Sequence, residues 1–210
     1  MGFVVGNAQL FIRRRQDETK FAARFVGLKV GQQLGGGPAS EFLRYFEEGK
    51  SIALVSDAGM PGVSDPGERL IRAAVEAGVA VEVIPGPSAP VTALVGSGLP
   101  MVPYYFGGFL PVKSGQRRKE LARAIVRDCT SVYFESPYRV VRMLEDAVAE
   151  IPQMRACVAR ELTKKFEEFR RGSPAELLEH FKAHEPRGEF CLVLAPPDEK
   201  LRVSNNEPHP

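Results

Sequence analysis

Residues 51–67 have the sequence Ser-Ile-Ala-Leu-Val-Ser-Asp-Ala-Gly-Met-Pro-Gly-Val-Ser-Asp-Pro-Gly, an apolar run followed by a long turn-rich segment. A short apolar run that ends in turn residues is typical of a buried strand, here Ser51 to Ser56. The segment Asp57 to Gly67 is long for a connection between a strand and a helix, which usually has about two to six residues. Because open α/β sheets bind ligands where their strands end, we predict a ligand-binding loop here.

The residues after this loop predict an alternation of helices and strands. Apolar residues recur at helical spacing in 66–77, and Gly78 is placed to end this helix. Residues 79–84 form a second apolar run typical of a buried strand, and Ser88 can cap a helix over 89–95. Strands and helices that alternate through short Gly/Pro loops indicate an α/β fold with parallel strands.

The second half of the chain repeats this alternation after a segment rich in Gly, Pro and aromatic residues, which we interpret as a crossover between subdomains. The expected helices are 116–126, 137–151 and 173–184, and the expected strands are 131–134, 156–159, 166–170 and 190–194. Ser173, with Glu176 three residues later, predicts a capping box. We therefore expect an N-terminal α/β subdomain over 1–107 with an atypical stretch over 1–40, a C-terminal α/β subdomain over 108–195, and a flexible tail over 196–210.

Composition narrows the class of protein. The chain has 210 residues, 44% of them hydrophobic, and a net charge of +2, so any nucleic-acid surface must be local. Its three cysteines form no Cys-x-x-Cys pair, which fits a reducing cytoplasm and argues against a structural zinc. His180 and His184 have the spacing of a helical metal pair but no third ligand nearby, so no metal is expected.

Charged residues follow several predicted strands and helices. Glu135 and Ser136 end a strand with Arg139 in the next helical turn, and the run 160–165, Arg-Glu-Leu-Thr-Lys-Lys, follows another strand. Both are candidates for a ligand cleft, and both are also compatible with ordinary surface loops. The helix over 116–126 carries a basic face that suits a phosphate backbone, although a solvated helix face is the commoner explanation of such a pattern.

Six motifs occur in order along the chain: S-D-A-G-M-P-G-V-S-D-P-G from Ser56, P-G-P-S-A from Pro85, G-F-L-P from Gly108, E-S-P-Y-R from Glu135, A-R-E-L-T-K from Ala159 and G-E-F-C-L-V from Gly188. Together they resemble the ribosomal RNA small-subunit methyltransferase I family of the tetrapyrrole-methylase-like superfamily, over about Glu41 to Leu194. The resemblance implies two α/β subdomains with S-adenosylmethionine in a cleft between them, in a cytoplasmic homodimer. It also implies methylation of the 2′-hydroxyl of a cytidine in small-subunit ribosomal RNA.

The same resemblance implies roles for individual residues. Those that would line the cofactor are Asp57, Ala58, Gly59, Val63, Ser64, Asp65, Pro87, Ser88, Ala89, Glu135 and Ser136. Basic residues that would contact RNA are Arg117, Arg118, Arg123, Arg139, Arg160 and Lys164. Either Glu161 or Lys165 could take the proton of the acceptor hydroxyl, the lysine only if burial or neighbouring cations lower its pKa.

The first residues depart from the family pattern. Only Val5-Gly6-Asn7 resembles the family's first cofactor loop, so we expect a shortened N-terminal subdomain. Two alternatives stay open: a superfamily methyltransferase that acts on a small tetrapyrrole, and a catalytically impaired RNA-binding remnant.

Overall fold

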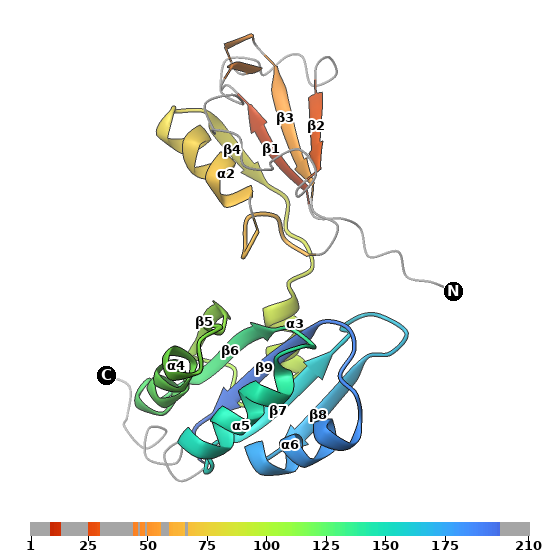
Figure 1. The fold of residues 1–210 in the computed structure, drawn as a ribbon. Coiled ribbons are helices and arrows are strands. Elements are labelled where there is room, and N and C mark those ends of the chain that lie inside the picture. Colours follow the sequence, from red (N-terminus) through yellow and green to blue (C-terminus); the bar gives the residue numbers. More distant parts are fainter. Residues whose placement is uncertain are drawn as a thin grey trace. The chain divides into compact units, whose positions relative to one another are not determined.

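The computed structural model describes residues 9–13, 25–29, 44–45, 47–48, 50–55, 59–65 and 67–197 (Figure 1). Its contacts divide the chain into two compact units, Met1–Ser88 and Ala89–Pro210. The subdomain boundary expected between residues 107 and 108 stays a prediction, and the two compact units are described separately below.

A four-stranded sheet forms the first unit, with the strand order β2-β3-β1-β4. Its elements are β1 (Gln9–Arg13), β2 (Phe25–Lys29), β3 (Ser51–Val55), α2 (Gly67–Glu76) and β4 (Ala80–Val83). Strand β3 buries Ile52 and Leu54, and α2 buries Leu70 and Ala74, as the apolar spacing predicted. In this sheet, the expectation of parallel neighbours holds for the described strands β2 and β3 but not for the others, because β1 lies between β3 and β4 and runs antiparallel to both.

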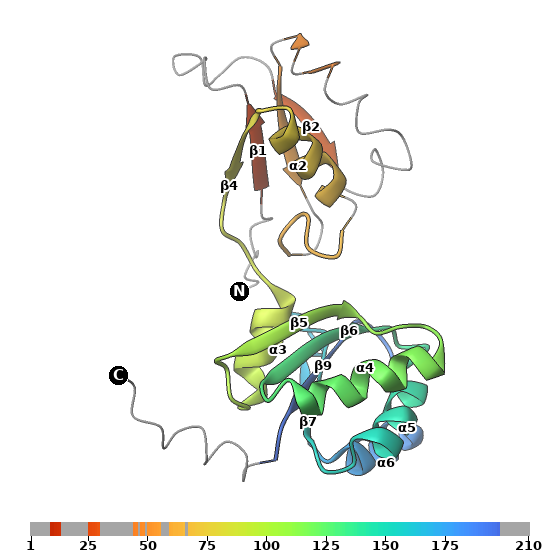
Figure 2. The ribbon, with the colours of Figure 1, turned by 90° about the vertical axis from the view of Figure 1, so that its left-hand side faces the viewer.

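The second unit is a five-stranded sheet with the order β5-β6-β9-β7-β8 and helices on both faces (Figures 1 and 2). Its elements are α3 (Ala89–Ser97), β5 (Tyr104–Phe109), α4 (Ser114–Val126), β6 (Thr130–Glu135), α5 (Val140–Glu150), β7 (Arg155–Arg160), β8 (Glu168–Gly172), α6 (Pro174–Ala183) and β9 (Phe190–Ala195). The predicted capping box is confirmed at Ser173 and Glu176.

Alternate residues of the central strand β9 build two cores. Leu192 and Leu194 pack in the cluster formed with α4, α5 and α6, whereas Cys191 and Val193 pack in the cluster formed with α3. All six residues of β9 are buried, which is what a strand covered on both faces requires.

Strand β5 is the element of the second unit that the sequence did not predict. Gly107 and Gly108 lie within it, and glycine in a strand interior weakens the sequence signal. A Cβ at Gly107 would lie 2.4 Å from the ring of the buried Tyr133, so close packing explains this glycine. The register of β5 against β6 also shifts between Phe106 and Phe109, where the two glycines lie.

Candidate functional site

The loop over 59–65 in the first unit has a backbone fixed by its own contacts. Gly59, Gly62 and Ser64 all have φ in the left-handed region, at 77°, 85° and 57°. Oδ1 of Asp65 accepts hydrogen bonds from the backbone N–H of Gly67 (2.6 Å) and of Gly62 (3.3 Å). Such a loop is shaped before any ligand arrives, which lowers the entropy that binding costs.

Gly59 brings two predicted cofactor segments together. A Cβ at this position would lie 3.3 Å from the carbonyl oxygen of Pro87, so the segment that includes Pro87 lies directly against the loop. Val63 and Ser64 are exposed on the same loop, and Pro87 and Ser88 are partly buried. The glycine cradle and the exposed loop fit a ligand that the backbone approaches closely.

Two of the predicted cofactor residues lie outside the described residues, and three, Ala89, Glu135 and Ser136, lie in the other unit. Asp57 and Ala58 belong to the part of the chain that the structure leaves undescribed. Ala89 begins α3 and packs partly buried against the core of the second unit. Within the first unit, the contact between the 59–65 loop and the Pro87 segment is therefore the described part of the predicted cofactor site.

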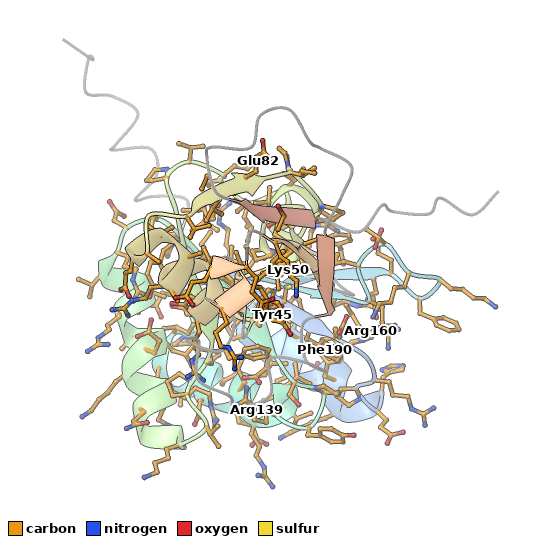
Figure 3. All side chains as sticks on the ribbon, turned by 90° about the horizontal axis from the view of Figure 1, so that it is seen from above. Tyr45, Lys50, Glu82, Arg139, Arg160 and Phe190 are labelled. Carbon is orange, nitrogen blue, oxygen red and sulfur yellow. The ribbon has the colours of Figure 1, made fainter. Side chains whose placement is uncertain are left out.

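In the second unit, four neighbouring strands begin or end along one side of the sheet, which we call the sheet edge. Glu135 at the end of β6 pairs with Phe190 of β9, Phe190 pairs with Arg160 of β7, and Arg160 pairs with Glu168 of β8. Figure 3 labels Arg139, Phe190 and Arg160 at this edge. The motifs E-S-P-Y-R, A-R-E-L-T-K and G-E-F-C-L-V, far apart in the sequence, thus meet in one place.

Glu135 is the most deeply buried charged residue of this edge. Its Oε1 accepts a hydrogen bond from the Ser136 N–H (2.7 Å) and lies 2.6 Å from Nη2 of Arg139, whereas its Oε2 has no hydrogen-bond partner in the described part of the chain. Burial raises the pKa of Glu135 above its usual value, against the lowering effects of the Ser136 N–H and Arg139. Arg139 also donates to the Leu110 carbonyl (3.4 Å), which ties the G-F-L-P motif to the same edge.

Glu161 serves as a structural acceptor. Its Oε1 accepts from Nζ of Lys164 and from the backbone N–H of Glu189, both at 3.0 Å. The Lys164 ammonium and the Glu189 N–H hold the pKa of Glu161 below its usual value, which makes its carboxylate a weaker proton acceptor. Lys165 is exposed, so burial, one of the two conditions named for its role as a base, is not found. The assignment of either residue as the base stays a prediction.

The predicted basic face on α4 contains one residue that is not on the surface. Arg117 is buried, with Nη2 2.6 Å from Oδ2 of Asp146 and Nη1 donating to the Val112 carbonyl at 3.0 Å. This corrects the expectation for Arg117, because a buried guanidinium held by a carboxylate is not available to RNA. The charge pattern of α4 alone cannot show that Arg117 has an acidic partner, Asp146, on α5.

The other predicted RNA-contacting residues all have acidic partners. Arg118 lies against Asp146 and Glu150, Arg123 against Glu120, Arg139 against Glu135, Arg160 against Glu168, and Lys164 against Glu161 and Glu189. Contacts with a phosphate would have to compete with these ion pairs. Their roles in RNA binding stay predictions.

Residues 38–178 match the family of tetrapyrrole (corrin/porphyrin) methylases. The chain belongs to this family. It is 44% identical, over 73% of its length, to the ribosomal RNA small subunit methyltransferase I of Halalkalibacterium halodurans, of which it covers 53%. It is 46% identical to the protein of the same name from Micromonospora olivasterospora, over 74% of this chain and 50% of that protein. The chain thus spans about half the length of the curated relatives it matches.

Comparison with solved structures shows the same fold as in two other proteins. The methyltransferase CobJ is similar with a TM-score of 0.56 and 20% identity, over 75% of this chain and 70% of that chain. A diphthine synthase gives a TM-score of 0.57 and 18% identity, over 74% and 65% of the two chains. Within the described residues, no helix is long and apolar enough to cross a membrane.

Three residues of the second unit that take part in or adjoin the contacts described above were not named from the sequence. Phe190 and Gly188 lie in the G-E-F-C-L-V motif. The motif marked this segment as part of the family pattern, but neither residue was assigned a role from the sequence. Asp146 is a buried acid on α5 beside the apolar residues Met143 and Ala147. A charged residue on an otherwise apolar helix face is a signal for a buried ion pair, and here that pair is with Arg117.

Proposed function

We propose that this chain transfers a methyl group from S-adenosylmethionine to the 2′-hydroxyl of a cytidine in small-subunit ribosomal RNA. The observation that carries the proposal is its 44–46% identity to relatives named ribosomal RNA small subunit methyltransferase I. A tetrapyrrole acceptor is the second candidate, supported by the family's description. RNA is preferred because a solved cobalamin biosynthetic enzyme, a cobalt precorrin-4 methyltransferase, shares only 16% identity with this chain.

The proposed cofactor site begins with the 59–65 loop and the Pro87 segment. When bound, S-adenosylmethionine supplies a methyl group already activated on a sulfonium, so the protein mainly has to align the acceptor oxygen. The left-handed residues and Asp65 keep the loop in one shape, and Gly59 allows the Pro87 carbonyl to lie close against it. Asp57, Ala58, Ala89, Glu135 and Ser136 remain part of the proposed set.

Gly59→Val is expected to weaken S-adenosylmethionine binding by roughly ten-fold or more. The new side chain meets the Pro87 carbonyl oxygen, and its φ of 77° is strained for a β-branched residue. Isothermal titration calorimetry measures the effect. Gly78→Val is the matched control, because Gly78 has a φ of 69° in the same unit but nothing within 4 Å of an added Cβ. Equal affinities of the two variants would remove Gly59 from the cofactor site.

The same titration of the unsubstituted chain tests the proposed function itself. Measurable heat of binding is expected for an S-adenosylmethionine-dependent methyltransferase. An RNA-binding remnant without cofactor affinity would give no heat, and that result would exclude the proposed activity.

We also propose that the chain forms a homodimer, and apolar side chains along the edge strand β5 support this. Tyr104 and Phe109 of β5 and the flanking Val102 and Val112 are exposed, and among the described strands β5 has β6 as its one neighbour. Several exposed apolar side chains along and beside an edge strand are typical of an interaction surface. Light scattering with size-exclusion chromatography is expected to give twice the mass of the chain. A monomer mass at micromolar concentration would contradict this proposal.

A further inference from the structure

The turn between β7 and β8 displays an aromatic ring and a cation next to each other. Phe166 is 63% exposed, and Nζ of Lys165 lies 5.5 Å from the centre of its ring. A single exposed aromatic residue is common on protein surfaces and needs no explanation by itself. What separates Phe166 from that ordinary case is the construction of the turn that carries it.

The turn is tied to the start of β9 by a closed set of hydrogen bonds. The Glu161 N–H donates to the Glu189 carbonyl, and the Glu189 N–H donates to Oε1 of Glu161, both at 3.0 Å. Nζ of Lys164 donates to the carboxylates of Glu161 (3.0 Å) and Glu189 (2.8 Å). The Thr163 N–H donates to Oε2 of Glu167 at 2.6 Å, which closes the turn from its other side.

This bracing holds a strained backbone. Glu161 and Thr163 have φ values of 49° and 64°, in the left-handed region that non-glycine residues disfavour. Strained residues of this kind persist where the surroundings fix them, and they concentrate at ligand-binding sites. Gly188, with a φ of 90°, makes room for the brace, since a Cβ there would lie 2.4 Å from the Glu161 carboxyl group.

The charges of the turn divide into occupied and available groups. The Lys164 ammonium is taken up by Glu161 and Glu189, and the Glu167 carboxylate accepts from Thr163. For Lys165, by contrast, the described part of the chain provides no acidic partner, only the ring of Phe166. Among the residues that the structure describes, the turn therefore presents a cation without an acidic partner beside an exposed aromatic ring. An unpaired nucleotide offers the matching pair, a base that can stack and a phosphate that carries negative charge.

We propose that Phe166 stacks on an unpaired base of the RNA substrate while Lys165 binds a neighbouring phosphate. Glu161 and Gly188 are positioning residues that hold the turn. The proposal rests on the proposed function, since it takes small-subunit ribosomal RNA as the substrate. It assigns RNA contact to a turn at the sheet edge near Arg160, in place of the basic face of α4.

Fluorescence tests the stacking contact directly, because the chain has no tryptophan. In Phe166→Trp the new indole is expected to keep RNA binding and to be quenched when an unstructured oligoribonucleotide of about twelve nucleotides is added. Val126→Trp, at an 82% exposed position on α4, is the control and should keep its emission. RNA binding without selective quenching of the Phe166→Trp protein would overturn the proposal.

Affinity measurements give a second, independent readout. Phe166→Ala is expected to bind the oligoribonucleotide and purified small subunits roughly ten-fold more weakly, whereas Phe166→Tyr retains affinity. Lys165→Ala should reduce the slope of log affinity against log salt concentration by about one. If Phe166→Ala lost affinity for intact small subunits but not for free RNA, Phe166 would contact a ribosomal protein. That result would contradict the proposal.

The outcomes separate this proposal from the proposed function. If the unsubstituted chain methylates small subunits and Phe166→Ala does so with unchanged KM, the stacking contact alone is wrong. If the unsubstituted chain neither binds nor methylates RNA, the proposed function fails and the stacking contact fails with it.

Discussion

Asp146→Ala is expected to lower the free energy of unfolding of the second unit by about 3–5 kcal/mol, the largest stability loss that we predict. The Asp146 carboxylate and the Arg117 guanidinium are both buried, with side chains only 6% and 5% exposed. Ser114 Oγ also donates to Asp146 at 2.9 Å. Removing the carboxylate leaves the guanidinium buried without a counter-charge, which costs more than the ion pair itself contributes.

Urea unfolding followed by circular dichroism measures this loss. The double substitution Arg117→Met with Asp146→Leu is the control, because replacing both charges with apolar groups of similar size is expected to restore most of the stability. A single Asp146→Ala variant that loses less than about 1 kcal/mol would show that Arg117 finds water or another partner.

The Asp146 carboxylate also makes the free energy of unfolding depend on pH. Burial tends to raise the pKa of Asp146, but hydrogen bonds from Arg118, Ser114 and Arg117 outweigh it and hold the pKa below its usual 3.8. The folded chain therefore binds this proton less readily than the unfolded chain. The stability that Asp146 contributes is full above about pH 4 and is lost as the pH falls through the lower pKa of the folded state. Asp146→Ala should flatten this acid limb of the stability profile.

Gly188→Ala is expected to reduce affinity for small subunits by at least as much as Phe166→Ala, roughly ten-fold, without touching Phe166 itself. The added methyl group meets the Glu161 carboxyl group at 2.4 Å, so the carboxylate has to leave the Glu189 N–H and Lys164. The turn then loses the brace that keeps Lys165 and Phe166 in place. Filter binding measures the affinity, and the calorimetric titration should show unchanged S-adenosylmethionine binding.

Gly98→Ala is the matched control for this substitution. Gly98 has a φ of 71° in the same unit, and an added Cβ there has nothing within 4 Å. Both variants carry the backbone strain of a left-handed alanine, of about 1 kcal/mol, so both should be somewhat less stable. Only Gly188→Ala should lose RNA affinity. Equal RNA affinity of the two variants would contradict the positioning role of Gly188.

Local signals in the sequence predicted most of the helices and strands. The apolar run Ile52 to Leu54, the spacing of Leu70 and Ala74, and the Ser173–Glu176 capping box each lie within a few residues, and the structure confirms them. Strand β1 was not predicted because its place between β3 and β4 depends on pairing with residues about 40 and 70 positions later.

The candidate site could be predicted only in part, for the same physical reason. The motifs predicted charged residues at strand ends, and the structure shows Glu135 at the end of β6 in an ion pair with Arg139, which directly precedes α5. The burial of Arg117 depends on Asp146, 29 residues later, and the fixed turn at Glu161 depends on the N–H of Glu189, 28 residues later. Contacts over such distances are set by packing, which the charge pattern of a single helix or turn does not contain.

Nucleoside analysis of the acceptor is a direct test of methyl transfer to a cytidine in small-subunit ribosomal RNA. Purified small ribosomal subunits that lack the modification would be incubated with the chain and S-adenosylmethionine, and their RNA would be digested and examined by mass spectrometry. A parallel reaction would offer a tetrapyrrole precursor as the acceptor. We expect a gain of 2′-O-methylcytidine in the ribosomal RNA and no methylation of the tetrapyrrole. Methyl transfer to the tetrapyrrole alone, or to neither acceptor, would contradict this expectation.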